Sequence, residues 1–137
     1  MIISITGTPG TGKTSISRLL KEKGFDVVDF NKVALENNFL LGKDKKRDSF
    51  IVDIKKFNKY VKENYSQKNI IFIDGHLSHL LENVDKIIIL RSHPDALRKN
   101  LLKKGWNKKK IKENIDAEIL DVILCEALNL HKPKNIF

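Results

Sequence analysis

A phosphate-binding pattern near the start of the chain constrains the fold more than any other feature. Residues 7–14 read GTPGTGKT and match G-x-x-x-x-G-K-[ST]. Residues 1–6 form an apolar, β-branched run that predicts a buried strand, and residues 15–23 place Ile16, Leu19 and Leu20 at the i, i+3, i+4 spacing of a helix face. Strand, glycine-rich turn and helix are the context that separates a true phosphate loop from a chance match. We therefore expect the chain to bind a nucleoside triphosphate, the alternative being a glycine-rich turn without a ligand.

Each residue type in the loop has a chemical reason. Glycines let backbone N–H groups wrap a phosphate, and the helix amino terminus adds partial positive charge. The ammonium group of Lys13 is expected to reach the β- and γ-phosphates, while the hydroxyl of Thr14 is placed to ligate Mg²⁺. The residues predicted to bind ATP in this loop are Gly10, Thr11, Gly12, Lys13, Thr14 and Ser15.

Strand and helix patterns alternate along the rest of the chain. Residues 69–74 and 86–91 are continuous apolar runs, which are typical of central strands in a parallel sheet covered on both faces. The alternation predicts an α/β fold of the P-loop NTPase type, with helices on both faces of a parallel sheet of four or five strands. Between the phosphate loop and residue 69 we expect a strand at 25–30, a helix capped by Asn31 and ending at Asn37, an exposed loop at 41–49 and a helix at 53–63. After residue 91 we expect a helix capped by Ser92 and ended by Gly105, and then one long helix at 107–130 with Ile115, Ile119, Val122 and Ile123 facing the core. The tail at 131–137 could form a last strand.

Composition limits the class of protein. A chain of 137 residues is the size of one domain, and its net charge of +9 favours anionic partners, either phosphates or nucleic acid, although a solvated lysine-rich surface is equally compatible with it. The single cysteine, Cys125, permits no internal disulfide and fits a reducing cytoplasm; its apolar surroundings predict a buried thiol. No signal peptide and no membrane-spanning run is expected.

A carboxylate and two histidines follow the apolar run 69–74. Asp74 ends that run as the Walker B carboxylate does, so it is predicted to hold Mg²⁺ at the ligand crevice of the sheet. His76, two residues later, is predicted to position a water or a substrate phosphate. For His79 a capping or surface contact is the favoured interpretation. A zinc site is disfavoured because no cysteine accompanies the histidines.

A basic segment lies between two predicted helices. Six of the ten residues 103–112 are lysine, and Gly105 and Trp106 interrupt them. Such a segment is compatible with a lid that closes over triphosphate, or with a merely solvated helix face. Trp106 is expected to pack the hinge of the lid rather than to stack on a base. Arg91 ends the run 86–91 and is predicted to contact phosphates with its bidentate fork, whereas Arg98 is expected at the surface.

Guanine specificity is not expected. Residues 31–34 begin like the guanine-reading N-K-x-D motif, but Ala34 lacks the carboxylate that pairs with guanine. No D-x-x-G switch is present either. Adenine is therefore the expected base.

Taken together, these residues resemble the adenylate kinase isoenzyme 6 family, also called the coilin-interacting nuclear ATPase family, which has archaeal members. The resemblance rests on the phosphate loop 7–14, the run Asp74-Gly75-His76, the pair Leu90-Arg91, and the segment 101–119. It implies a broad-specificity nucleoside monophosphate kinase, of the adenylate kinase type, that also hydrolyses ATP. It also implies a role in maturation of the small ribosomal subunit, with a ribosomal protein or rRNA as partner. By this resemblance Asp74 and His76 form a D-x-H pair.

The same resemblance divides the single domain 1–137 into a core, a small acceptor-binding region at about 31–64, and a lid at about 101–112. Three positions depart from the family pattern. Leu35 replaces an arginine expected to contact AMP, while Asn100 and Lys104 stand where relatives carry arginines. Lysine keeps the charge but loses the bidentate fork, so Lys104 is still predicted to contact ATP. The departures weaken the expectation of AMP phosphorylation more than that of ATP binding.

Three functions are compatible with the sequence. The leading one is phosphoryl transfer from ATP to a nucleoside monophosphate such as AMP, with Lys13, Asp74 and His76 as catalytic residues. The second is an ATP-switched ribosome assembly factor with little kinase activity, which the charge and Leu35 favour. The third is a small-metabolite kinase of the shikimate or gluconate type, which the scarcity of arginines disfavours.

Overall fold

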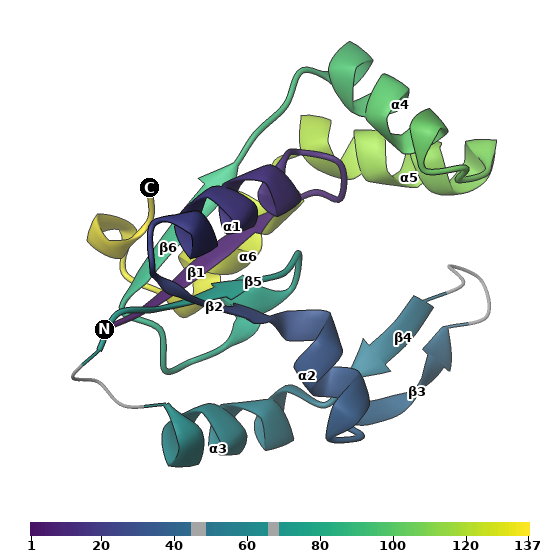
Figure 1. Cartoon of the computed structure of the whole chain (residues 1–137). Helices are drawn as coiled ribbons and strands as arrows, with labels where there is room; N and C mark the ends of the chain where they lie inside the picture. The colour runs from purple at the N-terminus through teal and green to yellow at the C-terminus, as the bar shows by residue number, and fades with distance from the viewer. Residues whose placement is uncertain (45–48, 66–68) are drawn as a thin grey trace.

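The computed structural model describes residues 1–44, 49–65 and 69–137 and is built around a four-stranded parallel sheet. The strand order is β2-β5-β1-β6 (Figure 1), with β1 at the centre carrying the chain into the phosphate loop. The tail, predicted to form a last strand, adds only a bridge between Ile136 and Ile87 at the open side of β6. The sheet strands are β1 (Ile2–Gly7), β2 (Asp26–Asp29), β5 (Ile71–Asp74) and β6 (Lys86–Leu90).

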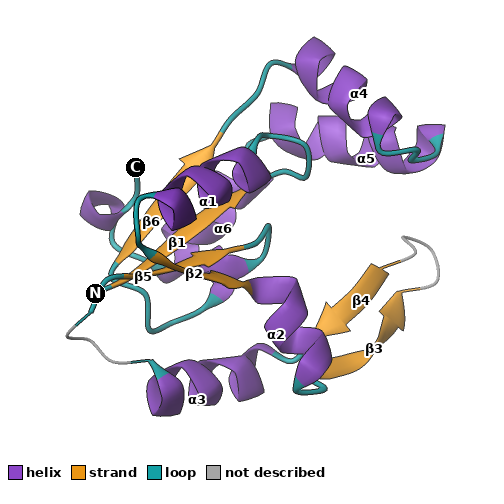
Figure 2. Cartoon of the chain, viewed as in Figure 1, coloured by secondary structure: helices purple, strands orange, loops and turns teal. Residues whose placement is uncertain are grey.

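Both faces of the sheet are covered, as the continuous apolar runs predicted (Figure 2). Successive residues of β1 point to opposite faces, since side chains alternate along a strand. Ile3 and Ile5 pack with Leu20 of α1 (Lys13–Glu22) on one face. Ile2 packs on the other face with Ala127 of α6 (Val122–Leu130). The helix face predicted for α1 is only partly correct, because Leu20 is covered while Ile16 and Leu19 are exposed.

The chain between β2 and β5 forms two helices that pack together and a β-hairpin. Phe30 of α2 (Phe30–Glu36) stacks on Phe57 of α3 (Ile54–Asn64), with ring centroids 4.3 Å apart. The cap of α2 is Asp29 rather than the predicted Asn31, because its carboxylate accepts from the amide of Lys32 at 3.1 Å. The exposed loop predicted at 41–49 is also wrong: its described residues belong to an antiparallel hairpin, β3 (Leu40–Asp44) and β4 (Ser49–Val52), while residues 45–48 lie outside the described part.

Three helices follow β6. His93, rather than the predicted Ser92, caps α4 (Pro94–Lys103), because its Nδ1 accepts from the amide of Asp95. Leu97 and Leu101 of α4 are buried against α5 (Lys108–Ile119). Figure 1 shows α4 and α5 as a pair that projects from the sheet. Two 3₁₀ turns, η1 (Ser78–Leu80) and η2 (Pro133–Asn135), complete the elements.

The single long helix predicted at 107–130 is wrong. Asp121 adopts a left-handed backbone conformation with φ of 55°, which ends α5 and starts α6 in a new direction. Aspartate tolerates this conformation better than most side chains. Ile119 and Val122, predicted to face the core, are exposed. Cys125, predicted to be buried, is also exposed on α6. None of the helices in the described part of the chain is long and apolar enough to cross a bilayer.

Candidate active site

The phosphate loop joins β1 to α1 and has the backbone that its glycines allow. Gly10 and Gly12 have φ of 93° and 99°, in the left-handed region that favours glycine. A Cβ on Gly10 would lie 2.9 Å from Leu97 Cδ1, so the loop also needs glycine for its close packing against α4. Gly12 precedes α1 without a side-chain cap, and the first amides of the helix are therefore available to phosphate oxygens.

Lys13 is folded back onto the loop. Its Nζ donates to the carbonyl oxygens of Gly7 at 2.7 Å and Thr8 at 3.1 Å. Burial lowers the pKa of Lys13 to about 8, an effect that the carboxylate of Asp74 partly offsets and the ammonium of Lys104 reinforces. The ammonium group is thus poorly solvated, and an incoming anion would stabilise its charge.

The predicted magnesium residues share one pocket. Thr14 and Asp74 line a pocket of about 240 Å³ beside α1. Ser17, buried on α1, donates from Oγ to Asp74 Oδ2 at 2.5 Å and so orients the carboxylate. Asp29 lines the same pocket because it is the register partner of Asp74 on the neighbouring strand. Arg18 and Lys21 add two cations to the lining.

The two histidines after Asp74 have different environments. Burial, reinforced by the ammonium of Lys13, lowers the pKa of His76 to about 4, so its imidazole is neutral at pH 7. A neutral imidazole offers one donor and one acceptor to a water or a substrate. His79 was expected to make a capping or surface contact, but its side chain is fully buried and contacts Thr6 of β1. Its Nδ1 lies 2.9 Å from Thr6 Oγ1 and its Nε2 lies 3.3 Å from Glu126 Oε1.

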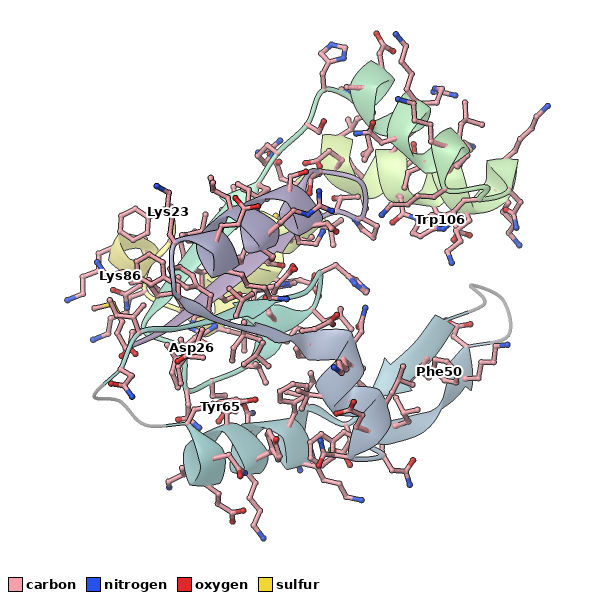
Figure 3. The ribbon with its side chains drawn as sticks, in the orientation of Figure 1. Lys23, Asp26, Phe50, Tyr65, Lys86 and Trp106 are labelled. Atoms are coloured by element: carbon pink, nitrogen blue, oxygen red, sulfur yellow. The ribbon has the colours of Figure 1, made fainter. Side chains whose placement is uncertain are left out.

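Helix α4, which precedes the segment predicted to be a lid, contacts the phosphate loop directly. Asn100 on α4 donates from its side-chain amide to the carbonyl of Gly10 at 2.8 Å. Trp106 lies at the turn between α4 and α5 (Figure 3) and packs on the cluster around Leu97 and Leu101. The ammonium of Lys110 lies 4.2 Å from the centre of its ring. Lys104 acts electrostatically on both Lys13 and His76, which places its charge near the loop.

Arg91 has carboxylate partners in this structure. Its Nε donates to Glu118 Oε1 at 3.1 Å, and its Nη2 pairs with the carboxylate of Asp121. The guanidinium of Arg91, which the sequence predicted to contact phosphates, is therefore paired with two carboxylates of the chain itself. Arg98 is exposed, as expected, and Leu35 is 54% exposed on α2.

The structure thus brings the predicted loop residues, Asp74 and His76 together, with Lys104 nearby. Sequence reasoning missed Asp29, Ser17 and Glu118, and for Asn100 it missed the contact with the phosphate loop. Asp29 carries the same signal as Asp74, a carboxylate at the end of a strand. Ser17 is a polar residue on the buried side of α1, and that contrast could have revealed it. Asn100 and Glu118 have no comparable signal because their partners lie far away in the sequence, in Gly10 and Arg91.

These residues fit a magnesium nucleotide. Phosphate oxygens suit the uncapped amino terminus of α1, the glycine backbone of the loop and the poorly solvated ammonium of Lys13. Mg²⁺ is held in such sites by one or two carboxylates together with substrate phosphates, and here the candidates are Thr14 and Asp74, with Asp29 beside them.

Comparison with known proteins agrees with this geometry. The AAA domain family model matches residues 3–121. Solved structures with a similar fold include shikimate kinase from Acinetobacter baumannii in complex with shikimate, with a TM-score of 0.60 and 13% identity over 92% of this chain and 79% of that one. Another is shikimate kinase from Bacteroides thetaiotaomicron, with a TM-score of 0.56 and 15% identity over 100% of this chain and 85% of that one. At such identities the likeness shows the fold alone. The fold and the loop define a P-loop NTPase with the kinase architecture.

Relatives at higher identity narrow the class. The "Putative adenylate kinase" of Methanocaldococcus jannaschii is 44% identical over 93% of this chain, which spans 72% of that protein. The protein of the same name from Pyrococcus furiosus is 44% identical over 96% of this chain and 71% of its own length. The chain belongs to this adenylate kinase-like family and is an ATP-dependent phosphotransferase.

Proposed function

We propose that the protein is a nucleoside monophosphate kinase that transfers the γ-phosphoryl group of ATP to AMP, giving two ADP, and that it also hydrolyses ATP. The observation that carries the proposal is the convergence of Lys13, Thr14 and Asp74, which come from the phosphate loop, the first turn of α1 and the end of β5. The names of the relatives support AMP as acceptor.

In-line phosphoryl transfer needs positioning and charge neutralisation rather than a covalent intermediate. Lys13 would neutralise charge on the transferring group, and the loop amides would hold the phosphates. Thr14 and Asp74 would hold Mg²⁺, which would supply positive charge to offset the negative charge of the phosphates. Neutral His76 would orient the acceptor or, in its absence, a water, which accounts for hydrolysis. Ser17 keeps Asp74 in position for this role.

Two segments are proposed to move substrates into place. Residues 31–64, which contain α2, the hairpin and α3, would bind the acceptor, and residues 101–112 would act as a lid. The contact of Asn100 with Gly10 supports the lid, since it fastens the base of that segment to the loop. We place the whole activity in one domain and in the cytoplasm, where the exposed thiol of Cys125 would stay reduced.

The test is a panel of nucleoside monophosphates incubated with labelled ATP and Mg²⁺, scored for acceptor phosphorylation against acceptor-free hydrolysis. We expect ADP to form from AMP, and Lys13→Ala to abolish its formation. Binding of MgATP without phosphorylation of any acceptor would refute the kinase assignment and leave the ATP site intact.

A second function is favoured by two observations. The net charge is +9, and Leu35, which is exposed on α2, stands where the family pattern has an arginine expected to contact AMP. Both would suit an ATP-switched factor of the adenylate kinase isoenzyme 6 type that binds a ribosomal protein or rRNA during small-subunit maturation. Capture of small-subunit components that changes with ATP would support this role. Capture that is identical with ATP, with ADP and with the Lys13→Ala variant would exclude an ATP switch.

A further inference from the structure

Arg91, Glu118 and Asp121 form an ion-pair cluster, the clasp, at the base of the lid. Arg91 follows β6 and begins the connection to α4, whereas Asp121 lies in the connection from α5 to α6. The guanidinium joins these two connections through Glu118 Oε1 at 3.1 Å and through Asp121. Both chain segments that link the α4–α5 pair to the sheet are therefore tied at one point.

The clasp lies directly against the phosphate loop. Gly7 is the register partner of Leu90, the residue before Arg91. Gly7, Thr8 and the three clasp residues all line one small cavity of about 10 Å³. Glu118 also acts electrostatically on Lys13. A negative charge on Glu118 is thus close to the place where the loop would hold phosphates.

Glu118 is the least exposed member of the clasp. Its side chain is 6% exposed, and its Oε2 has no hydrogen-bond partner among the described residues. Arg91 supplies the contact that compensates this buried charge. Removing one partner of a fully buried ion pair typically shifts an equilibrium by roughly a hundredfold to several thousandfold, and the 51% exposure of the Arg91 side chain reduces that effect here. A single hydrogen bond to a charged group contributes roughly ten- to a hundredfold. If Arg91 left Glu118 to bind a phosphate, the loss of the ion pair would therefore weaken nucleotide binding more than the new hydrogen bond would strengthen it.

We propose that Arg91 is a positioning residue that ties the two lid connections together and compensates buried Glu118, rather than a ligand of the ATP phosphates. Glu118 is then its necessary partner. The clasp compensates the charge of the Glu118 carboxylate near the phosphate loop and fixes α4 and α5 relative to the loop. The proposal rests on the ATP site of the proposed function and is independent of the acceptor.

The experiment measures the Kd of MgATP by calorimetry for wild type, Arg91→Gln, Glu118→Gln and the double variant. We expect Arg91→Gln to weaken binding by at least about thirtyfold, because Glu118 is left unpaired near the loop. We expect Glu118→Gln to weaken it by about three- to tenfold, and the double variant to lie within about threefold of Glu118→Gln. Lys99→Gln on α4 and Glu113→Gln on α5 are exposed controls that change charge equally and should bind like wild type.

A phosphate ligand would give the opposite pattern. Glu118→Gln would then bind MgATP as well as wild type or better, and the double variant would be as weak as Arg91→Gln. Either result overturns the proposal, as does Arg91→Gln binding like wild type. If Arg91→Gln alone fails to fold while the double variant folds and binds, the clasp is supported. Failure of wild type to bind MgATP would instead refute the proposed function.

Trp106 gives a second measurement. It is the only tryptophan of the chain and lies at the turn between α4 and α5. Because the clasp fixes the base of this pair, we expect Arg91→Gln to shift the emission of Trp106 without nucleotide, and the double variant to restore most of the shift. Emission unchanged in Arg91→Gln would contradict a positioning role.

Discussion

The side-chain amide of Asn100 donates to the carbonyl oxygen of Gly10 at 2.8 Å, across 90 positions of sequence. Leu97 and Leu101, on the same face of α4, leave no room for a Cβ on Gly10. Helix α4 is therefore packed on the phosphate loop and hydrogen-bonded to it. A displacement of either element would disturb the other, because packed interiors do not deform smoothly.

This contact predicts the effect of Asn100→Leu. The variant loses a hydrogen bond of about 0.5–1.5 kcal/mol, so the free energy of unfolding in urea should fall by about that amount. The Kd of MgATP should rise several-fold as the loop loosens. Asn129→Leu, at an exposed position of α6, is the matched control. Equal behaviour of the two variants would show that the contact with Gly10 contributes nothing.

Lys13 predicts how nucleotide binding depends on pH. Burial lowers its pKa to about 8, and a bound triphosphate should raise it again by stabilising the ammonium. Above pH 8 binding must therefore take up a proton, and the Kd of MgATP should be roughly tenfold higher at pH 9 than at pH 7. Calorimetry in buffers of different ionisation enthalpy measures the proton uptake. A flat profile in wild type would contradict the prediction, and Lys13→Ala should bind weakly at every pH.

Asp74 predicts the response to metal. Asp74→Asn keeps the size of the side chain but removes a hard anionic ligand, so phosphoryl transfer should fall by at least about a hundredfold and Mn²⁺ should bind more weakly by electron paramagnetic resonance. Ser17→Ala should lower the rate by about tenfold, since it frees the orientation of Asp74. Chelation of metal should stop transfer in wild type. Asp26→Asn is the control, because Asp26 is exposed at the end of β2 that is opposite to Asp29.

His79 predicts a loss of stability in mild acid. Burial lowers its pKa below 6.5, with a partial opposing effect of Glu126. The unfolded chain therefore takes up the proton first as the pH falls, and the free energy of unfolding should decrease below about pH 6.5. Urea denaturation between pH 7.5 and 5 measures this slope. His79→Gln should be less stable by about 1–3 kcal/mol at pH 7, because it disturbs a buried hydrogen-bond pair, and should show a shallower slope. An equal slope in wild type and in His79→Gln would show that other groups cause the loss of stability in acid.

Local pattern predicted the elements whose signal lies within a few residues. The phosphate loop, the apolar strands and the carboxylate of Asp74 were found because glycine placement and strand alternation constrain the backbone directly. The hairpin of β3 and β4 was missed since its strands are exposed and carry little apolar alternation. The long helix was wrongly predicted as continuous because the left-handed residue Asp121 is paired with Arg91, a contact that spans 30 positions.

The sequence alone determined that this chain has a phosphate loop between a strand and a helix, a carboxylate at the end of another strand, and a basic segment at 103–112. These depend on short-range geometry, which residue identity and spacing encode. Only the tertiary structure decided that Asn100 holds Gly10, that Asp29 stands beside Asp74, and that the fork of Arg91 is occupied by Glu118 and Asp121. Those contacts form when packing brings distant segments together, and burial then decides which charges must be paired.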